Sequence, residues 1–502
     1  DKAQGFKAKY TYGPSAREWI IQEALAELHK GGRCWVSCEG RRASQTIGEM
    51  LRADGYKVLI VNKLTKETPE VQAFLANAEE ECFQYDAIVH SPTITSGMSI
   101  TGEKNGKHFT RGFFLGGGWR LQPTVCAQML RRVRYIKEWS IGIAPNNGTQ
   151  SVSDASEERQ IQEIEQMTGQ RVDGREAFIR RIEHLDVNQR AEFASAMIWL
   201  LEDMRFTIER VPCSVSAELA EQVSAKASAL DEVARAAIIA APVLTDEEAQ
   251  TLRRSHEKTA TDHYTLTAFD IRAAFGIETL TPEIVNFYDE GRGVARARRF
   301  ANALGLVFKD KRPDRALNDD GAIQRELYRY LFDGIDLLGT ITKDIAETVL
   351  DRIMARRFTL AVFGCVPAKF ARITELDSKG RVTVKEDKDG HICEFKRPKY
   401  AVQVLGEVLD MMGLKSEEAK QAGSDGKRSR EYIISSETRD LMMAISNAQI
   451  PPILYDIRGN VCAAQEPANA QTPEDQPIFI PEKPEPIPAN DVWQEEDESR
   501  FS

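Results

Sequence analysis

Short apolar strands alternate with helices over the first 145 residues, and this alternation restricts the possible folds more than any other feature of the sequence. Within the expected strands the apolar residues are nearly consecutive, as in the run YKVLIV at residues 56–61. Strands of this kind are buried on both faces, as in parallel sheets that helices cover on each side. The sequence therefore predicts an α/β fold whose first domain is a parallel sheet.

Helix signals fall between these strands at the spacing that a parallel sheet requires. Gly31 and Gly32 end the first expected helix, and Pro123 begins the last one, where its missing N–H leaves no bond unmade. We expect strands at residues 33–38, 56–61, 87–89, 112–115 and 140–144, the last closing the sheet, and helices at residues 15–30, 43–51, 70–81 and 123–133.

The rest of the chain divides by composition. Residues 146–156 (NNGTQSVSDAS) form the first linker, and helical periodicity follows it. Alternating segments between Arg372 and Phe395 predict a small antiparallel β-hairpin element, compatible with a winged-helix-like wing or a strand-separating pin, with a plain structural hairpin as the alternative. We therefore expect a sheet domain at residues 1–150 and a mainly helical domain at residues 151–370. A hairpin with helices would follow at residues 371–462 and a tail at residues 463–502.

Acidic charge is concentrated at the C-terminal end of the chain. The formal net charge is −11, and residues 463–502 hold ten acidic residues against Lys483 and Arg500. The remaining residues are therefore close to neutral together, and their basic side chains can cluster locally. The same 40 residues contain seven prolines, so we expect a disordered acidic tail.

The sequence contains no pattern typical of a metal site or a membrane span. Its eight cysteines form no C-x-x-C pair, and with seven dispersed histidines they give no zinc-ligand spacing, so we expect no metal site. Scattered cysteines suit a reduced, cytoplasmic compartment. The longest apolar run, Ala236–Leu244, has nine residues, whereas a membrane helix needs about 20. The first residues, Asp1–Gln4, include no Met, and we expect them to be the cut end of a longer chain.

Two polar segments follow strands of the sheet domain. The first is the basic turn Glu39–Ala43 after the strand Cys34–Cys38, and the second is His90–Ile100, which is rich in Ser, Thr and Gly. Hydroxyl groups and bare backbone allow such a turn to approach a phosphate closely. Taken alone, either turn is ordinary in an α/β protein.

A third segment, Gln128–Arg134 (QMLRRVR), lies in the last expected helix. The three- and four-residue spacing would place Gln128, Arg131 and Arg132 on one helix face, with Arg134 off that face. An Arg-rich helix face alone is most often a solvated surface. The signal is the occurrence of all three segments in one order, each at the end of its strand or on its helix.

The content and order of these segments resemble motifs IV, V and VI in the second RecA-like domain of superfamily 2 helicases, over about residues 15–145. The variant most similar to this chain is the origin-binding type found in viral, plasmid and phage replication proteins, whose last motif is Gln-x-x-x-Arg-x-Arg. Gln128, Arg132 and Arg134 match that motif. The resemblance implies that residues 1–150 are a RecA-like helicase domain.

The resemblance also implies a role for each matching residue. Arg132 and Arg134 would be arginine fingers, because a planar, permanently charged guanidinium can neutralise a transferring γ-phosphoryl group. Gln128 would couple the nucleotide state to domain closure. The nucleotide side of the cleft would comprise Ser96, Gly97 and Arg131, and the contacts to a single strand would come from Ser37, Arg41, Arg42, Thr93 and Thr95.

The implied cofactors are ATP and Mg²⁺, but the sequence lacks the motifs that hold them. No G-x-x-x-x-G-K-[ST] occurs, and no Asp-Glu pair follows an apolar strand. The segment Gly102–His108 is one residue too short and lacks the hydroxyl that binds Mg²⁺. We therefore expect an upstream RecA-like domain of the same chain to hold the nucleotide, and no ATP hydrolysis by residues 1–502 alone.

A second basic region lies at residues 292–312, with Arg296 and Arg299 as candidate contacts to the DNA backbone. The nearby rings of Tyr288 and Phe300 could stack on bases. A solvated helix face is the alternative for this region.

We expect the chain to be the C-terminal part of an ATP-dependent DNA helicase that acts on single-stranded or forked DNA, in the replication initiation of a plasmid, phage or mobile element. The alternative from a different class is a non-enzymatic origin-DNA-binding or scaffold module that keeps the helicase fold, and an RNA helicase is a third. The acidic tail could bind a replication partner, although a solubilising tail fits its composition equally well. No membrane partner is expected.

Overall fold

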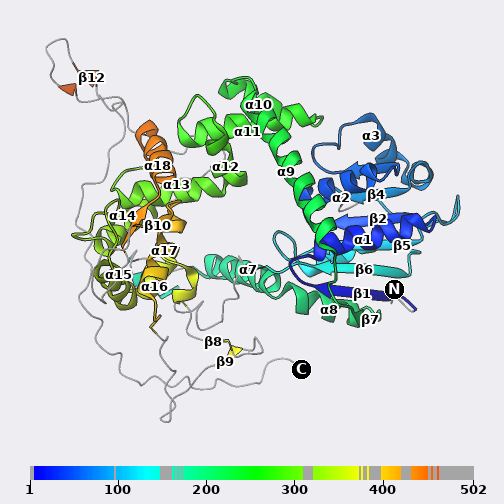
Figure 1. Ribbon diagram of the computed structural model, residues 1–502, viewed down its shortest axis with the longest axis horizontal. Coiled ribbons are helices and arrows are strands. Elements are labelled where there is room, and N and C mark those ends of the chain that lie inside the picture. Colours follow the sequence, from blue (N-terminus) through cyan, green and yellow to red (C-terminus); the bar gives the residue numbers. More distant parts are fainter. Residues whose placement is uncertain are drawn as a thin grey trace, which may run out of the picture.

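The computed structural model shows a parallel sheet domain beside a separate helical region (Figure 1). It describes residues 5–94, 98–146, 161–162, 164–166, 169, 171, 173–308, 320–371, 375–376, 382–383, 397–419, 431–449, 454–455 and 461–462.

Seven strands form the sheet in the order β3-β4-β2-β5-β6-β1-β7, and every pairing between neighbours is parallel. All residues of β2, β3 and β4 are buried, as the consecutive apolar runs predict. The fold class is therefore confirmed as a RecA-like α/β sheet followed by a mainly helical region. The strands are β1 (Lys7–Tyr12), β2 (Cys34–Cys38), β3 (Val58–Val61), β4 (Ala87–His90), β5 (Arg111–Gly116), β6 (Glu138–Ile143) and β7 (Thr207–Arg210).

Helices cover both faces of this sheet. One face packs Val36 and Phe113 against two helices, α1 (Ala16–His29) and α2 (Arg41–Ala53). The other face is built around Trp35, Phe114 and Trp139. Burying a large apolar side chain contributes roughly 1.5–3 kcal/mol, so these two layers hold the sheet in place. The helices of the second face are α3 (Pro69–Ala76), the short α4 (Ala78–Glu81), α5 (Pro123–Leu130) and α8 (Phe193–Asp203).

The sheet contains two strands that the sequence did not predict. Along β1 (KAKYTY) apolar and polar residues are mixed rather than consecutive, and β7 is a short, largely exposed edge strand, so neither carries the signal of a buried run. Because β1 pairs with β6 on one side and β7 on the other, residues 138–143 do not close the sheet. The sheet also continues beyond residue 150, to Arg210.

Helix α5 ends at Leu130, three residues earlier than the pattern predicts. The chain leaves the helix there because it pairs with another segment. The N–H of Ile100 donates to the carbonyl of Arg132 (2.8 Å), and the N–H of Arg134 donates to the carbonyl of Ile100 (3.0 Å). The prediction that Arg131 and Arg132 share a helix face with Gln128 is therefore wrong.

The helical region forms a second core. Phe275, Phe300 and Tyr328 are among its fully buried side chains. Two of its helices begin with capping boxes, in which Thr245 pairs with Glu248 and Thr259 with Asp262. The helices beyond the sheet domain are α7 (Gly174–Ala191), α9 (Ala217–Ile239), α10 (Asp246–Arg254), α11 (Ala260–Phe275), α12 (Pro282–Tyr288), α13 (Arg292–Ala303), α14 (Asp320–Leu331), α15 (Lys343–Ala355), α16 (Arg357–Val362), α17 (Ala401–Met411) and α18 (Ser436–Gln449).

Helix α9 joins the two parts of the molecule. It packs against α1 and α2 of the sheet domain and against α11 and α12 of the helical region, as Figure 1 shows. The turn between α12 and α13 thereby comes close to the sheet domain, where Glu290 contacts Arg41 and Arg120.

Small antiparallel pairs complete the structure. The predicted hairpin is confirmed by β8 (Glu375–Leu376) and β9 (Val382–Thr383), which pair antiparallel, while the rest of residues 372–395 lies outside the described residues. The expected linker from residue 147 onward and the expected disordered tail at 463–502 also lie outside them. Within the described ranges, no helix combines the length and the apolar character that crossing a membrane requires. The other pairs are β10 (Ser416–Glu418) with β11 (Tyr432–Ile434) and β12 (Leu454–Tyr455) with β13 (Val461–Cys462).

A neutral histidine is locked inside the sheet. His90 is fully buried, with its Nδ1 3.0 Å from the carbonyl of Ser91 and its Nε2 2.7 Å from the hydroxyl of Ser37. A carbonyl can only accept, so Nδ1 carries the proton and Nε2 accepts from Ser37. Burial lowers the pKa of His90, the hydrogen bond to Ser91 raises it and nearby Arg132 lowers it, and together they bring it to about 4.

This burial makes the stability of the sheet domain pH-dependent. Below its ordinary pKa of 6.5 the ring takes up a proton in the unfolded chain but not in the folded one, so stability is complete above pH 6.5 and falls toward pH 4. Between pH 6.5 and pH 4, we expect His90 to lower the free energy of unfolding by about 3 kcal/mol. Urea unfolding of His90→Asn at pH 7 and pH 4.5 should show a correspondingly smaller pH dependence. Ser37→Ala leaves the His90 ring buried and should keep the pH dependence of the parent. If His90→Asn showed the same pH dependence as the parent, the role assigned to His90 would be wrong.

Candidate functional site

The carboxyl ends of the parallel strands meet at one edge of the sheet. There β2 and β5 are neighbours, yet the helices that follow them, α2 and α5, pack on opposite faces. Such a topological switch point leaves a crevice between the two loops, which is where open α/β sheets bind ligands. The loops after β2 and β5 are therefore where functional side chains are expected.

A single buried carboxylate joins these two loops. Glu39, which follows β2, is 1% exposed. Its Oε2 accepts hydrogen bonds from the N–H groups of Gly117 (2.7 Å) and Gly118 (2.9 Å), and its Oε1 accepts from Arg120 (2.5 Å) and Leu121 (2.9 Å). Gly118 has φ +75°, which favours glycine. Four donors compensate the buried charge, and they fix the loop after β5 against the start of α2.

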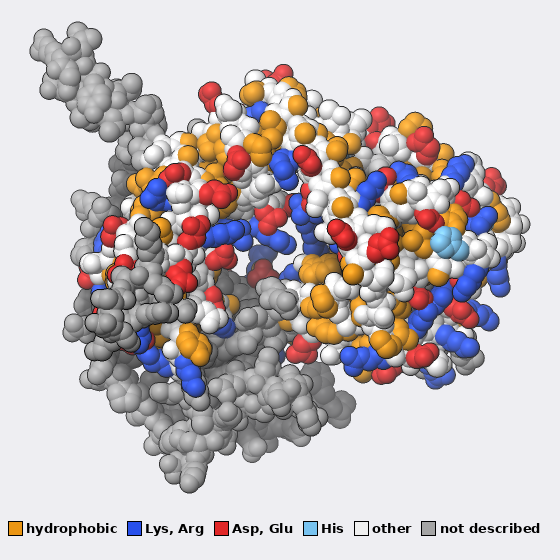
Figure 2. Space-filling view, viewed as in Figure 1, with side chains coloured by type: hydrophobic (Ala, Val, Ile, Leu, Met, Phe, Trp, Pro, Cys, Tyr) orange, Lys and Arg blue, Asp and Glu red, His pale blue; other side chains and the backbone are white. Residues whose placement is uncertain are grey.

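Basic side chains gather around this joint. Arg41 and Arg42 begin α2, Lys63 follows β3 and Arg120 follows β5. All four line a cavity of about 640 Å³, whose other wall comes from α9, α11 and the turn between α12 and α13. Figure 2 shows Lys and Arg side chains around the hollow between the sheet domain and the helical region.

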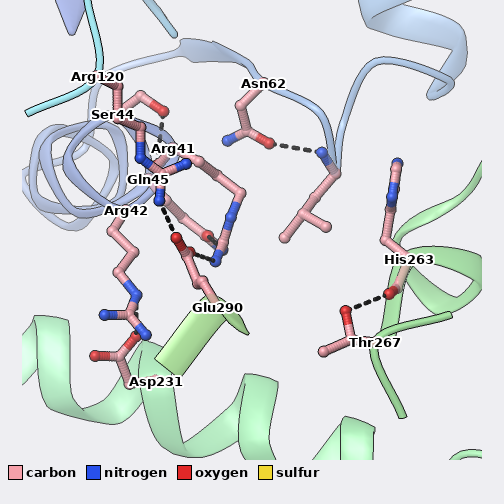
Figure 3. Close-up of polar contacts among 11 residues, drawn as sticks. Arg41, Arg42, Ser44, Gln45, Asn62, Arg120, Asp231, His263, Thr267 and Glu290 are labelled. Carbon is pink, nitrogen blue, oxygen red and sulfur yellow. Dashed lines mark hydrogen bonds and ion pairs between the residues drawn. The ribbon is translucent and has the colours of Figure 1, made fainter. Parts of the chain in front are cut away.

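Acidic side chains of the helical region reach into this cavity, as Figure 3 shows. Arg41 Nη2 lies 3.5 Å from Glu290 Oε1, and Arg120 pairs with the same carboxylate. Arg42 Nε lies 3.4 Å from Asp231 Oδ1 on α9. Partial desolvation, followed by the proximity of Arg41, lowers the pKa of Lys63. The site therefore concentrates positive charge that the protein itself partly compensates.

The second and third predicted segments meet elsewhere in the domain. Ile100 and Val133 form a parallel bridge. Arg132 Nη1 donates to the carbonyl of Met98 (3.1 Å), and Arg134 Nε donates to the hydroxyl of Ser99 (2.8 Å). Since α5 runs back from the carboxyl edge, this junction lies away from the cavity.

Two further predicted residues flank the junction. Gln128 is exposed near the end of α5. The guanidinium of Arg131 lies 4.9 Å from the centroid of the Phe6 ring, and its buried Nη1 has no hydrogen-bond partner within the described residues. Burial, and then the proximity of Arg134, lowers the pKa of Arg131.

The remaining predicted contacts in the sheet domain have different outcomes. Ser37 is fully buried in β2 and bonded to His90, so the prediction that it touches nucleic acid is wrong. The hydroxyl of Thr93 lies 3.1 Å from that of Ser91, just beyond β4 at the carboxyl edge. Thr95, Ser96 and Gly97 lie outside the described residues.

In the second basic region, Arg299 has a structural role. Arg299 donates to the carbonyls of Gly364 (3.0 Å) and Met411 (3.4 Å), which joins three segments of the helical core. The rings proposed to stack on bases, Tyr288 and Phe300, are 8% and 0% exposed, so those predictions are wrong. Arg296 is half-buried on α13, and its contact with DNA stays a prediction.

Sequence reasoning did not single out Lys63, Arg120 or Glu290, which line the cavity. Lys63 and Arg120 each stand within four residues of the end of a buried strand, so the rule that ligands bind at carboxyl ends would have found them. Glu290 gave no such signal, because it comes from the helical region and contacts arginines 249 and 170 residues away in the chain.

Comparison with known proteins does not identify a family. No protein-family model and no curated protein matches the chain. Solved structures similar to part of it include S. cerevisiae Dbp5 bound to RNA and ADP BeF3 (12% identity, 44% of this chain and 46% of that chain, TM-score 0.25). Another is T4 UvsW (11% identity, 43% of this chain and 43% of that chain, TM-score 0.26). A third is the DEAD-box helicase Mss116 bound to ssRNA and UDP-BeF (9% identity, 56% of this chain and 44% of that chain, TM-score 0.26).

The chain thus spans less than half the length of each of these three structures. Because every TM-score is near 0.25, the similarities carry no argument, and the fold assignment rests on the sheet itself. Among the residues that the structure describes, no group of three or more His, Cys, Asp or Glu side chains could hold a metal ion.

The Glu39 contacts predict a large effect of a small substitution. Glu39→Gln keeps one oxygen but turns an NH₂ group toward two backbone N–H donors, so we expect the sheet domain to lose about 3 kcal/mol of unfolding free energy. Urea unfolding followed by tryptophan fluorescence measures this loss. Glu138→Gln, an equal change at an exposed position of β6, should stay within about 0.5 kcal/mol of the parent. Equal stability of the two variants would rule out the role assigned to Glu39.

Proposed function

We propose that residues 5–210 form the second motor domain of a superfamily 2 nucleic-acid helicase. In this proposal the carboxyl edge binds the backbone of a single strand through Arg41, Arg42 and Thr93. Arg132 and Arg134 act on the γ-phosphate of a nucleotide that another RecA-like domain holds, with ATP and Mg²⁺ as cofactors. Gln128 couples that nucleotide to the closure of the two domains.

The junction between Met98–Ile100 and Arg132–Arg134 is the observation that supports this proposal most directly. The two segments lie more than 30 residues apart in sequence, and the helicase resemblance needs them together. The Ile100–Val133 bridge joins their backbones, and side chains of both arginines bond to the Met98–Ile100 segment. An arginine fork held in place by neighbouring backbone loses little freedom when it meets a phosphate.

The separation of the two basic sites also fits a motor domain. One site lies at the carboxyl edge, and the other lies where α5 has run back from that edge. A helicase domain must hold a strand and a nucleotide at the same time, each through its phosphates. Two distinct arginine clusters on one sheet can perform these tasks without competing.

We further propose that the strand is DNA and that the reaction serves replication initiation of a plasmid, phage or mobile element. This finer proposal rests on the Gln-x-x-x-Arg-x-Arg form of the last motif. The non-enzymatic alternative, an origin-DNA-binding or scaffold module, would bind the same strand at the carboxyl edge without any step that depends on Arg132.

Strand binding can be measured on the 502-residue chain directly. We expect a fluorescent dT20 oligonucleotide to bind, and its affinity to fall roughly 20- to 50-fold between 50 and 200 mM salt, as three or four phosphate contacts predict. Arg42→Gln should flatten the slope of log Kd against log salt by about 0.7. Arg329→Gln, an exposed arginine of α14, serves as the control and should change neither quantity. Absence of dT20 binding at 50 mM salt would exclude this assignment of the carboxyl edge.

The assignment of the arginine fingers is tested in a protein that combines this chain with the nucleotide-binding RecA-like domain that the proposal requires. Arg132→Gln should lower the rate of ATP-driven unwinding about 10³-fold or more, because a finger arginine contributes that much in related NTPases. Arg210→Gln, at the exposed end of β7, should leave the rate within twofold. If the Arg132→Gln variant binds dT20 normally and its unwinding rate stays within a few-fold of the parent rate, Arg132 is not an arginine finger. That result would favour the non-enzymatic binding module.

A further inference from the structure

Three consecutive residues between α12 and α13 adopt left-handed backbone conformations. The φ angles are +39° at Asp289, +54° at Glu290 and +97° at Gly291. Glycine adopts this region freely, whereas each of the other two residues is strained there by roughly 1–2 kcal/mol. Such a turn persists only where other contacts stabilise it.

The strained turn directs the Glu290 carboxylate at two arginines of the sheet domain. Arg41 approaches it from the start of α2 and Arg120 from the loop after β5, as Figure 3 shows. The Glu290 side chain is still 34% exposed, so solvent and solutes can reach the pair. These contacts connect the helical region to the switch point of the sheet.

The start of α2 favours an anion at this position even without Glu290. The helix begins with Arg41 and Arg42, two cations at its positive end, which by itself is unfavourable. Its N-cap is Gly40, which has no side chain to cap the helix, and its first turn contains no acidic residue. A negative group bound here would meet both the helix dipole and the arginines.

Glu290 supplies that negative group in this structure. Burial alone would raise the pKa of its carboxyl, but Arg120, Arg41 and Arg42 outweigh burial and hold the pKa below its ordinary value. The group is therefore ionised at neutral pH. Its two oxygens face the guanidinium groups of Arg41 and Arg120 as two oxygens of a phosphate could.

We propose that Arg41, Arg120 and the start of α2 form a phosphate-binding site at the switch point, and that Glu290 is its built-in competitor. A phosphate can bind between the two arginines only when the Glu290 turn moves away, so phosphate binding and docking of this turn exclude each other. The inference deepens the proposed function and rests on it for the source of the phosphate, a nucleic-acid strand. A free nucleotide is the other source of the same group.

Glu290→Gln tests this competition, since it keeps the shape of the side chain and removes its charge. Binding of labelled dT20 and binding of ATP are measured separately on the 502-residue chain at 50 mM salt. We expect the affinity for the probe that uses the site to rise about three- to fivefold, the contribution of a partly exposed ion pair. Adding Arg120→Gln to this variant should abolish the gain.

Asp289→Asn is the matched control. It removes the same charge from the same turn, but the Asp289 carboxylate lies 3.5 Å from Arg292 rather than beside Arg41 or Arg120. Its affinity for both probes should equal that of the parent. An equal gain in Asp289→Asn and Glu290→Gln would reveal only a general charge effect and overturn the proposal.

The two probes separate this inference from the function on which it rests. A higher affinity of Glu290→Gln for dT20 supports both the competition and the proposed function. A gain for ATP, with no dT20 binding by any variant, keeps the phosphate site and its competitor but removes the helicase assignment of the carboxyl edge. No gain for either probe, with the thermal melting temperature of the variant unchanged, overturns the competition.

Discussion

The buried carboxylate of Glu39 is the interaction on which the arrangement of the carboxyl edge depends. An ionised group inside a protein is costly unless its lone pairs are satisfied, and four backbone N–H groups of the loop after β5 satisfy these. The two loops of the switch point are thereby held as one unit. Arg41, at the start of α2, and Arg120, in the loop after β5, become neighbours across 79 residues of sequence because Glu39 sets the distance between their backbones.

Consecutive apolar residues predicted most of the sheet domain, because strands buried on both faces leave that pattern in the sequence. The pattern fails where burial is partial. β1 mixes exposed and buried residues and β7 is short, so the sequence predicted neither strand. The end of α5 escaped for another reason, since Leu130 is followed by good helix formers and only the pairing of Val133 with Ile100 draws the chain out of the helix.

The sequence predicted only those residues of the candidate site that a local sequence pattern identifies. Arg41, Arg42 and Thr93 were predicted because their segments resemble helicase motifs. The sequence could not show that Ser37 is sealed beneath the sheet surface or that Arg299 binds carbonyls of the helical core, since both facts depend on packing against distant segments. Glu290 depends on such packing most of all, because α9 brings its turn to the sheet domain.

The proposed function requires a nucleic-acid strand to bind at the switch point that Glu39 organises. Hydrogen–deuterium exchange of the 502-residue chain, with and without dT20, would detect this binding. We expect slower exchange at residues 39–42, 91–94 and 117–121 and faster exchange at residues 289–291, where the turn would be released. Protection confined to α13 and its neighbours, with the loops after β2 and β5 unchanged, would contradict the proposed function.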